Sequence, residues 1–101
     1  MIAWTTPTFT LRMPAKINME LVKNLYFTIS QNDVVVIDKR GEYVVTDGQL
    51  VYVYCEQEET GRLEKGIAEW QLNWTYENRR RMASRPKKIN VDPNMIKEVL
   101  V

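Results

Sequence analysis

Histidine is absent from this sequence of 101 residues, and cysteine occurs only once, at Cys55. Without histidine the chain lacks the commonest general base, the commonest metal ligand and every pair in which histidine activates a serine or a cysteine. A single cysteine excludes an internal disulfide bond and a cysteine-rich metal site. Chemistry based on carboxylates or lysine alone stays open, but no arrangement in the sequence supports it. We therefore expect a protein that is not an enzyme, with no catalytic residue, no metal and no cofactor.

Long apolar runs are also missing. No run approaches the roughly 20 apolar residues that cross a bilayer. Residues 1–7 lack the basic and then apolar blocks of a signal peptide. We therefore expect no transmembrane segment, no secretion signal and no membrane partner, and we expect the chain to be made and kept in the cytoplasm.

A strong charge of either sign is the third feature that the chain lacks. Lysine and arginine number 14 and aspartate and glutamate number 13, so the net charge is +1. Nucleic acid and anionic membranes therefore do not attract the chain as a whole, and any such attraction has to be local. The hydrophobic fraction of 45% and the charged fraction of 27% are ordinary for globular proteins. The length suits a single domain that spans residues 1–101.

The clearest structural signal lies in residues 66–76. Apolar side chains occupy alternate positions there, and polar side chains occupy the positions between them. Side chains alternate between faces in a strand, whereas residues two apart on a helix do not share a face. The segment is therefore predicted to be a strand with two tryptophans on its inner side. The predicted inner residues are Ala68, Trp70, Leu72, Trp74 and Tyr76.

Six further segments have the character of strands. Alternation is clear in residues 8–13, 23–31 and 50–55. Residues 34–37 are all β-branched, which hides their phase, and residues 43–45 form a brief piece between two turns. The predicted inner residues of the alternating segments are Phe9, Leu11, Met13, Leu25, Phe27, Ile29, Val51, Val53 and Cys55.

The last long segment, residues 80–91, has a broken period. The predicted inner residues before Pro86, Met82 and Ser84, have even numbers, whereas those after it, Ile89 and Val91, have odd numbers. A regular strand cannot place both pairs on one side. A bulge at Arg85–Pro86 would reconcile the two halves, and the proline would confine this strand to an edge of its sheet.

A short helix is predicted at residues 92–100. Asp92 can cap a helix, and Pro93 suits the first helical position. The apolar residues that follow have helical spacing. A helix of this length is marginal alone, so it has to dock on its own sheet or on a neighbour.

About seven short strands separated by turns, without alternation of strands and helices, predict an all-β fold. The predicted architecture is an immunoglobulin-like antiparallel β-sandwich of about seven strands in two sheets, with a short C-terminal helix.

Several landmarks follow one another along nearly the whole chain. Residues 24–31 form a strand that ends in Gln31 before a turn, and residues 50–55 run into Gln57–Thr60. Gly66 then opens the tryptophan strand, an Ala-Ser pair follows the hairpin, and Val-Asp and an apolar tail close the series. This order resembles small structural proteins encoded in the virion modules of phages and prophages of Gram-positive gut bacteria. More loosely, it is similar to the immunoglobulin-like N-terminal domain of phage baseplate upper proteins.

The resemblance implies a function carried out by protein surfaces. It implies a non-enzymatic structural or assembly component of a phage or prophage particle, in the tail, the baseplate or a connector. The implied partners are other virion proteins and further copies of the same chain in a homo-oligomer. The implied location is the bacterial cytoplasm on synthesis and then the virion.

Exposed tyrosines and the apolar tail are the candidate protein interface. Three tyrosines lie on the sides of their strands opposite to the predicted core, and exposed aromatic residues are typical anchors of interfaces. In the alternative interpretation the C-terminal helix covers one sheet face, and the tyrosines are ordinary packing residues. The candidate residues are Tyr26, Tyr52, Tyr54, Ile96, Val99 and Leu100.

Six positive charges within ten residues form a candidate basic patch. They can contact phosphates, which gives a small nucleic-acid-binding β module as the alternative function. In the simpler interpretation the patch is a solvated hairpin whose charges discourage pairing between edges, and an acidic patch on a virion subunit is a further possible partner. A carbohydrate-binding sandwich is the third function, disfavoured because Trp70 and Trp74 are predicted core residues. The basic residues are Arg79, Arg80, Arg81, Arg85, Lys87 and Lys88.

Overall fold

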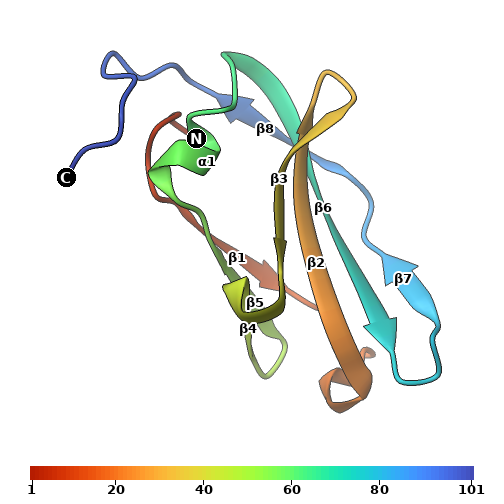
Figure 1. Ribbon diagram of the computed structural model, residues 1–101. Helices are drawn as coiled ribbons and strands as arrows, with labels where there is room; N and C mark the ends of the chain where they lie inside the picture. The colour runs from red at the N-terminus through yellow and green to blue at the C-terminus, as the bar shows by residue number, and fades with distance from the viewer.

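Strands make up most of the molecule. The computed structural model describes residues 1–101 and contains eight strands, one α-helix of four residues and two 3₁₀ turns (Figure 1). None of these helical elements has the length or the apolar composition that a bilayer crossing requires. The helical elements are η1 (Met19–Leu21), η2 (Gly41–Tyr43) and α1 (Gln57–Thr60). The strands are β1 (Thr8–Arg12), β2 (Val22–Gln31), β3 (Val34–Arg40), β4 (Val44–Asp47), β5 (Leu50–Tyr54), β6 (Gly66–Tyr76), β7 (Arg81–Ala83) and β8 (Lys87–Val91).

The strands form two antiparallel sheets, one on each side of the core (Figure 1). The three-stranded sheet has the order β1-β5-β4, and the five-stranded sheet has the order β3-β2-β6, with β7 and β8 both paired along β6. The prediction of an all-β antiparallel sandwich is confirmed, with eight strands in place of about seven. The strand order differs from the ABED and CFG sheets of an immunoglobulin constant domain, so the likeness to that fold is one of architecture.

One hydrophobic core lies between the two sheets. It contains 14 buried hydrophobic residues, which come from both sheets and from the segments that connect them. The ring centroid of Phe27 in β2 lies 5.2 Å from that of Phe9 in β1 and 5.8 Å from that of Trp70 in β6. Phe27 is 0% exposed and thus links the two sheets at the centre of the molecule.

The longest strand, β6, holds the five-stranded sheet together. It pairs with β2 on one side and with β7 and β8 on the other. Ala68, Leu72 and Trp74 are buried, and Trp70 and Tyr76 are half-buried, while the residues between them face outward. The alternation predicted for residues 66–76 is therefore confirmed.

A bulge separates β7 from β8. The backbone N–H of Ser84 donates to the carbonyl of Leu72, and Lys87 is paired with Trp70. The edge segment advances by three residues from Ser84 to Lys87, whereas β6 advances by only two residues between their partners Leu72 and Trp70. The edge segment therefore contains one extra residue. The bulge predicted at Arg85–Pro86 is confirmed, and so is the position of this segment at a sheet edge.

Residues 92–100 do not form the predicted helix. The side chain of Asn94 donates to the carbonyl of Ala3 and accepts from the N–H of Ile96. The amide group of Gln57 bonds both the N–H and the carbonyl of Leu100. These side-chain bonds compete with a helix that is marginal at this length, so the segment stays without regular structure beside α1 (Figure 1).

Candidate functional site

The outer face of each sheet is open. The turns η1 and η2 and the helix α1 lie at the ends of strands, and the C-terminal segment lies beside α1 (Figure 1). The interpretation in which a C-terminal helix covers one sheet face is therefore wrong, because that helix is absent. No helix therefore covers the side chains on either outer face, which are half-buried or exposed.

Aromatic and aliphatic side chains gather on the outer face of the three-stranded sheet. Tyr52 lies between Thr10 of β1 and Val45 of β4, and Tyr54 lies opposite Thr8. Tyr54 is 51% exposed and Val45 is 43% exposed. This surface, called the aromatic face below, contains the predicted interface residues Tyr52 and Tyr54. Its members are Thr8, Thr10, Arg12, Val45, Asp47, Leu50, Tyr52 and Tyr54.

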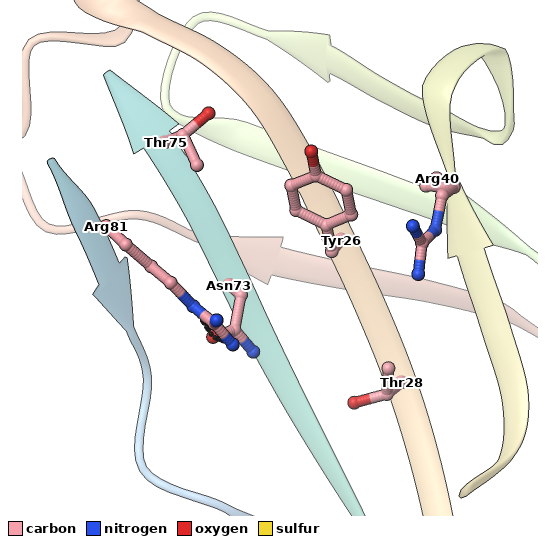
Figure 2. Close-up of a pocket in the computed structure, with 6 residues that line it drawn as sticks. All are labelled: Tyr26, Thr28, Arg40, Asn73, Thr75 and Arg81. Carbon is pink, nitrogen blue, oxygen red and sulfur yellow. Dashed lines mark hydrogen bonds between the residues drawn. The ribbon is translucent and has the colours of Figure 1, made fainter. Parts of the chain in front are cut away.

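Tyr26 lies on the other side of the molecule. It belongs to β2, and its side chain stands on the outer face of the five-stranded sheet among polar residues (Figure 2). The three tyrosines proposed from the sequence as interface residues therefore do not form one surface.

A shallow polar hollow of about 360 Å³ surrounds Tyr26 (Figure 2). Arg40 of β3 and Arg81 of β7 flank it on opposite sides. Asn73 Oδ1 accepts from Arg81 Nε at 3.2 Å and from Arg81 Nη2 at 3.1 Å. Arg40 Nη2 lies 2.6 Å from Asp38 Oδ2, and this hydrogen bond raises the pKa of Arg40. The hollow thus presents two oriented guanidinium groups on either side of an aromatic ring, a combination that can contact phosphates and stack on bases.

The six predicted basic residues are all exposed, but they do not form one patch. Arg81 points onto the outer face of the five-stranded sheet, where Lys88 is paired with Glu69. Lys87 points to the inner side, and its Nζ lies 5.7 Å from the ring centroid of Trp70. Alternation along the edge strands therefore divides the charges between two sides. The six residues are Arg79, Arg80, Arg81, Arg85, Lys87 and Lys88.

The apolar residues predicted as interface residues in the C-terminal segment are exposed. Ile96 and Val99 are each 49% exposed, and Leu100 is 55% exposed. Gln57 fixes Leu100 through two hydrogen bonds of 2.9 and 2.8 Å. These residues lie beside α1 and are not part of the aromatic face.

One buried ion pair joins β3 to α1. Lys39 Nζ lies 2.8 Å from Glu59 Oε1, and the two side chains are only 6% and 16% exposed. Burial raises the pKa of the neighbouring Cys55 thiol to about 11, and the Glu59 carboxylate contributes to the same shift. A thiol that stays protonated is a poor nucleophile, so this cluster acts as packing. The sequence did not predict the pair, because the β-branched run hides which way Lys39 points.

A groove of about 350 Å³ opens between β1 and the β7–β8 edge. Trp74 is 6% exposed, and its Nε1 has no hydrogen-bond partner. Trp70 is half-buried, and Lys87 lies over its ring. Trp74 is therefore a core residue, as predicted, and Trp70 lies at the margin of the core. The apolar lining includes Leu11, Met13, Trp70, Leu72, Trp74 and Met82.

Known proteins give no guide to the role of these surfaces. Comparison of the chain with protein-family models, with curated proteins and with solved structures found no match. Acidic and cysteine side chains nowhere gather in groups of three or more that could hold a metal ion. The aromatic face, the hollow around Tyr26 and the groove beside β1 are therefore interpreted from their own residues.

Proposed function

We propose that this chain is a non-enzymatic assembly component of a phage or prophage particle, in the tail, the baseplate or a connector, and that it works through protein–protein contacts. The observation that carries the proposal is the uncovered aromatic face. Tyrosine there combines a large apolar ring with a hydroxyl group that can bond across a contact, which is why tyrosine is enriched at the centres of interfaces.

The size of the aromatic face decides what kind of contact it makes. Three strands about 4.8 Å apart, two of them five residues long and one of them four, form a face of at most roughly 14 by 17 Å. A stable interface covers about 800 Å² on each partner, which is more than three times this area. The aromatic face is therefore one contact among several, as suits a subunit that touches more than one neighbour in a particle.

The placement in a phage particle rests on the sequence. The order of landmarks from the strand ending at Gln31, through Gln57–Thr60, to the strand opened by Gly66 resembles phage and prophage structural proteins. Under this proposal the chain is made in the bacterial cytoplasm and then enters the virion, with other virion proteins and copies of itself as partners. Neighbouring genes that encode capsid, portal or tail tape-measure proteins would support the same placement.

Removing the aromatic face is expected to reduce incorporation into particles. The double variant Tyr52→Ser, Tyr54→Ser removes one half-buried and one exposed ring from the outer face of β5 and leaves its buried face unchanged. Loss of two anchor residues costs about 2 kcal/mol or more of contact energy, which corresponds to about thirtyfold weaker association. Quantitative mass spectrometry of purified particles, with the variant expressed in place of the natural chain, measures the effect.

Tyr26→Ser is the matched control, since it removes the same ring from the opposite side of the molecule. It is expected to leave incorporation within about twofold of the natural chain. Particles that contain no copy of the natural chain would refute the proposed function. Equal incorporation of the double variant and the control would refute the role of the aromatic face.

A nucleic-acid-binding module is the second candidate, and the hollow around Tyr26 is the observation that favours it. Arg40 and Arg81 stand on either side of the half-buried ring of Tyr26 (Figure 2). If the assembly role is correct, fluorescence titration with single-stranded DNA and RNA gives no binding even at low salt, where phosphate contacts are strongest. Binding that weakens steeply with salt and disappears in Arg81→Ala would establish the second candidate instead.

A further inference from the structure

Among the strands at the sheet edges, β1 alone lacks the features that prevent pairing with another chain. β3 and the β7–β8 edge both carry bulges, and Pro86 interrupts the latter. β4 is only four residues long and ends in Asp47. β1 has five residues in unbroken register with β5, no internal proline and a single charge, at Arg12. A regular and nearly uncharged edge of this kind is a template for strand addition.

The free backbone groups of β1 follow from its pairing with β5. The N–H of Met13 donates to Gln49 at 2.8 Å, and the carbonyl of Pro7 accepts from Cys55 at 3.1 Å. In an antiparallel pair such bonds recur at every second residue, so Phe9 and Leu11 also bond to β5. The N–H and carbonyl groups of the residues between them point away from the sheet. Those residues are Thr8, Thr10 and Arg12, whose side chains are exposed.

We propose that β1 pairs with β1 of a second copy in an antiparallel arrangement whose two-fold axis passes through Thr10. Thr10 then faces Thr10 of the second copy, and Thr8 of each copy faces Arg12 of the other. Each of these pairs exchanges two backbone hydrogen bonds, which gives about six bonds and satisfies every free group of both strands. This dimer rests on the proposed assembly role, in which a second copy of the chain is one of the partners.

The side chains of β1 are complementary in the same register. On the inner side Phe9 of one copy lies opposite Leu11 of the other, as an apolar pair at a position where side chains approach closely. Arg12 lies opposite Thr8, so no like charges meet directly. A register centred on Arg12 would place the two arginines face to face, and it would leave Thr8 unpaired. The arrangement centred on Thr10 therefore agrees with both the backbone and the side chains.

The groove beside β1 gives the added strand an apolar surface. β1 forms one wall of the groove and the β7–β8 edge forms the other. Met82 on the far wall is 45% exposed, and Trp70 on the floor is half-buried. A strand added to β1 extends its sheet over this groove, so both side chains become less exposed. Pairing along β1 thus combines backbone hydrogen bonds with burial of apolar surface.

Light scattering coupled to size exclusion tests the proposal. The natural chain of 11.9 kDa is expected to approach twice that mass as its concentration rises. Thr10→Lys places two lysines face to face at the axis and is expected to weaken the dimer about tenfold or more. The matched control is Val45→Lys, an exposed residue on the same outer face at the opposite edge of the same sheet, and it is expected to leave the dimer unchanged.

A mixture of Thr10→Lys and Thr10→Asp separates a lost contact from a damaged fold. Each variant alone is expected to be monomeric, and the mixture is expected to form dimers because opposite charges then meet at the axis. A natural chain that stays monomeric at every concentration would overturn the proposal. So would a dimer that Thr10→Lys leaves intact.

Disulfide formation tests the register. Thr10→Cys places the two cysteines about 5.5 Å apart between Cα atoms, within the range that a disulfide bridges. Thr8→Cys places them about 14 Å apart, which is too far. Cross-linking through position 10 and not through position 8 is expected, and the reverse result would overturn the register. Particles that incorporate a monomeric natural chain would refute this dimer while leaving the proposed function standing.

Discussion

Phe27→Ala is expected to lower the free energy of unfolding by about 3–5 kcal/mol, because it leaves a cavity where the two sheets meet. Phe27 is 0% exposed, and its ring touches a ring from each sheet, Phe9 on one side and Trp70 on the other. The two neighbouring rings belong to paired strands, so they relax into this space only in part. A domain of this size has a total stability of about 5–15 kcal/mol, so the variant loses a large part of it.

Urea unfolding followed by tryptophan fluorescence measures the effect, with the slope of the transition compared between variants. Tyr26→Ala is the control, because it truncates the adjacent aromatic residue on the outer face of the same strand. It is expected to change the free energy of unfolding by less than about 1 kcal/mol. Equal losses from the two variants would mean that Phe27 is not the link between the sheets.

The sequence predicted the parts of this fold whose signal is local. In β6 the alternation of Ala68, Leu72 and Trp74 with polar residues specifies both the strand and its inner face, because side chains on a strand change sides at every residue. The bulge at Arg85–Pro86 was predictable for the same reason, since a change of parity within one strand requires an extra residue.

The C-terminal segment shows where local signals fail. Asp92 and Pro93 are good residues for a helix start, yet the segment follows the bonds offered by Asn94 and by Gln57, which lies more than thirty residues away in sequence. A short helix gains little free energy on its own, so a few competing hydrogen bonds decide the outcome. No pattern within residues 92–100 could have revealed the role of Gln57.

The candidate surfaces were also only partly predictable. Strand phase correctly placed Tyr26, Tyr52 and Tyr54 away from the core, but phase does not tell which sheet a strand joins. The outer faces of the two sheets lie on opposite sides of the molecule, so Tyr26 lies on one side and Tyr52 and Tyr54 lie on the other. The partner of Lys39 was hidden for a related reason, since four β-branched residues in a row leave the phase of β3 undefined.

The buried ion pair between Lys39 and Glu59 provides the second large effect. Glu59→Ala is expected to lower the free energy of unfolding by about 3–5 kcal/mol, because it leaves the buried ammonium group of Lys39 without its partner. Glu59 Oε1 also accepts the backbone N–H of Glu56 at 2.8 Å, so the first turn of α1 loses a bond as well. Only the face of Tyr43, 4.7 Å from Lys39 Nζ, remains to stabilise the charge.

Lys39→Met separates the cost of the unpaired charge from the loss of packing. Methionine keeps most of the apolar stem and needs no partner, so this variant is expected to lose less stability than Glu59→Ala. The double variant Lys39→Met, Glu59→Ala is expected to be more stable than Glu59→Ala alone, since it contains no buried unpaired ammonium group.

Asp38→Ala, which breaks the exposed pair with Arg40, is the control and is expected to change stability little. Urea unfolding of the natural chain, the two single variants and the double variant gives the cycle, and Asp38→Ala is measured beside them. A double variant no more stable than Glu59→Ala would show that the helix turn, and not the charge, accounts for the loss.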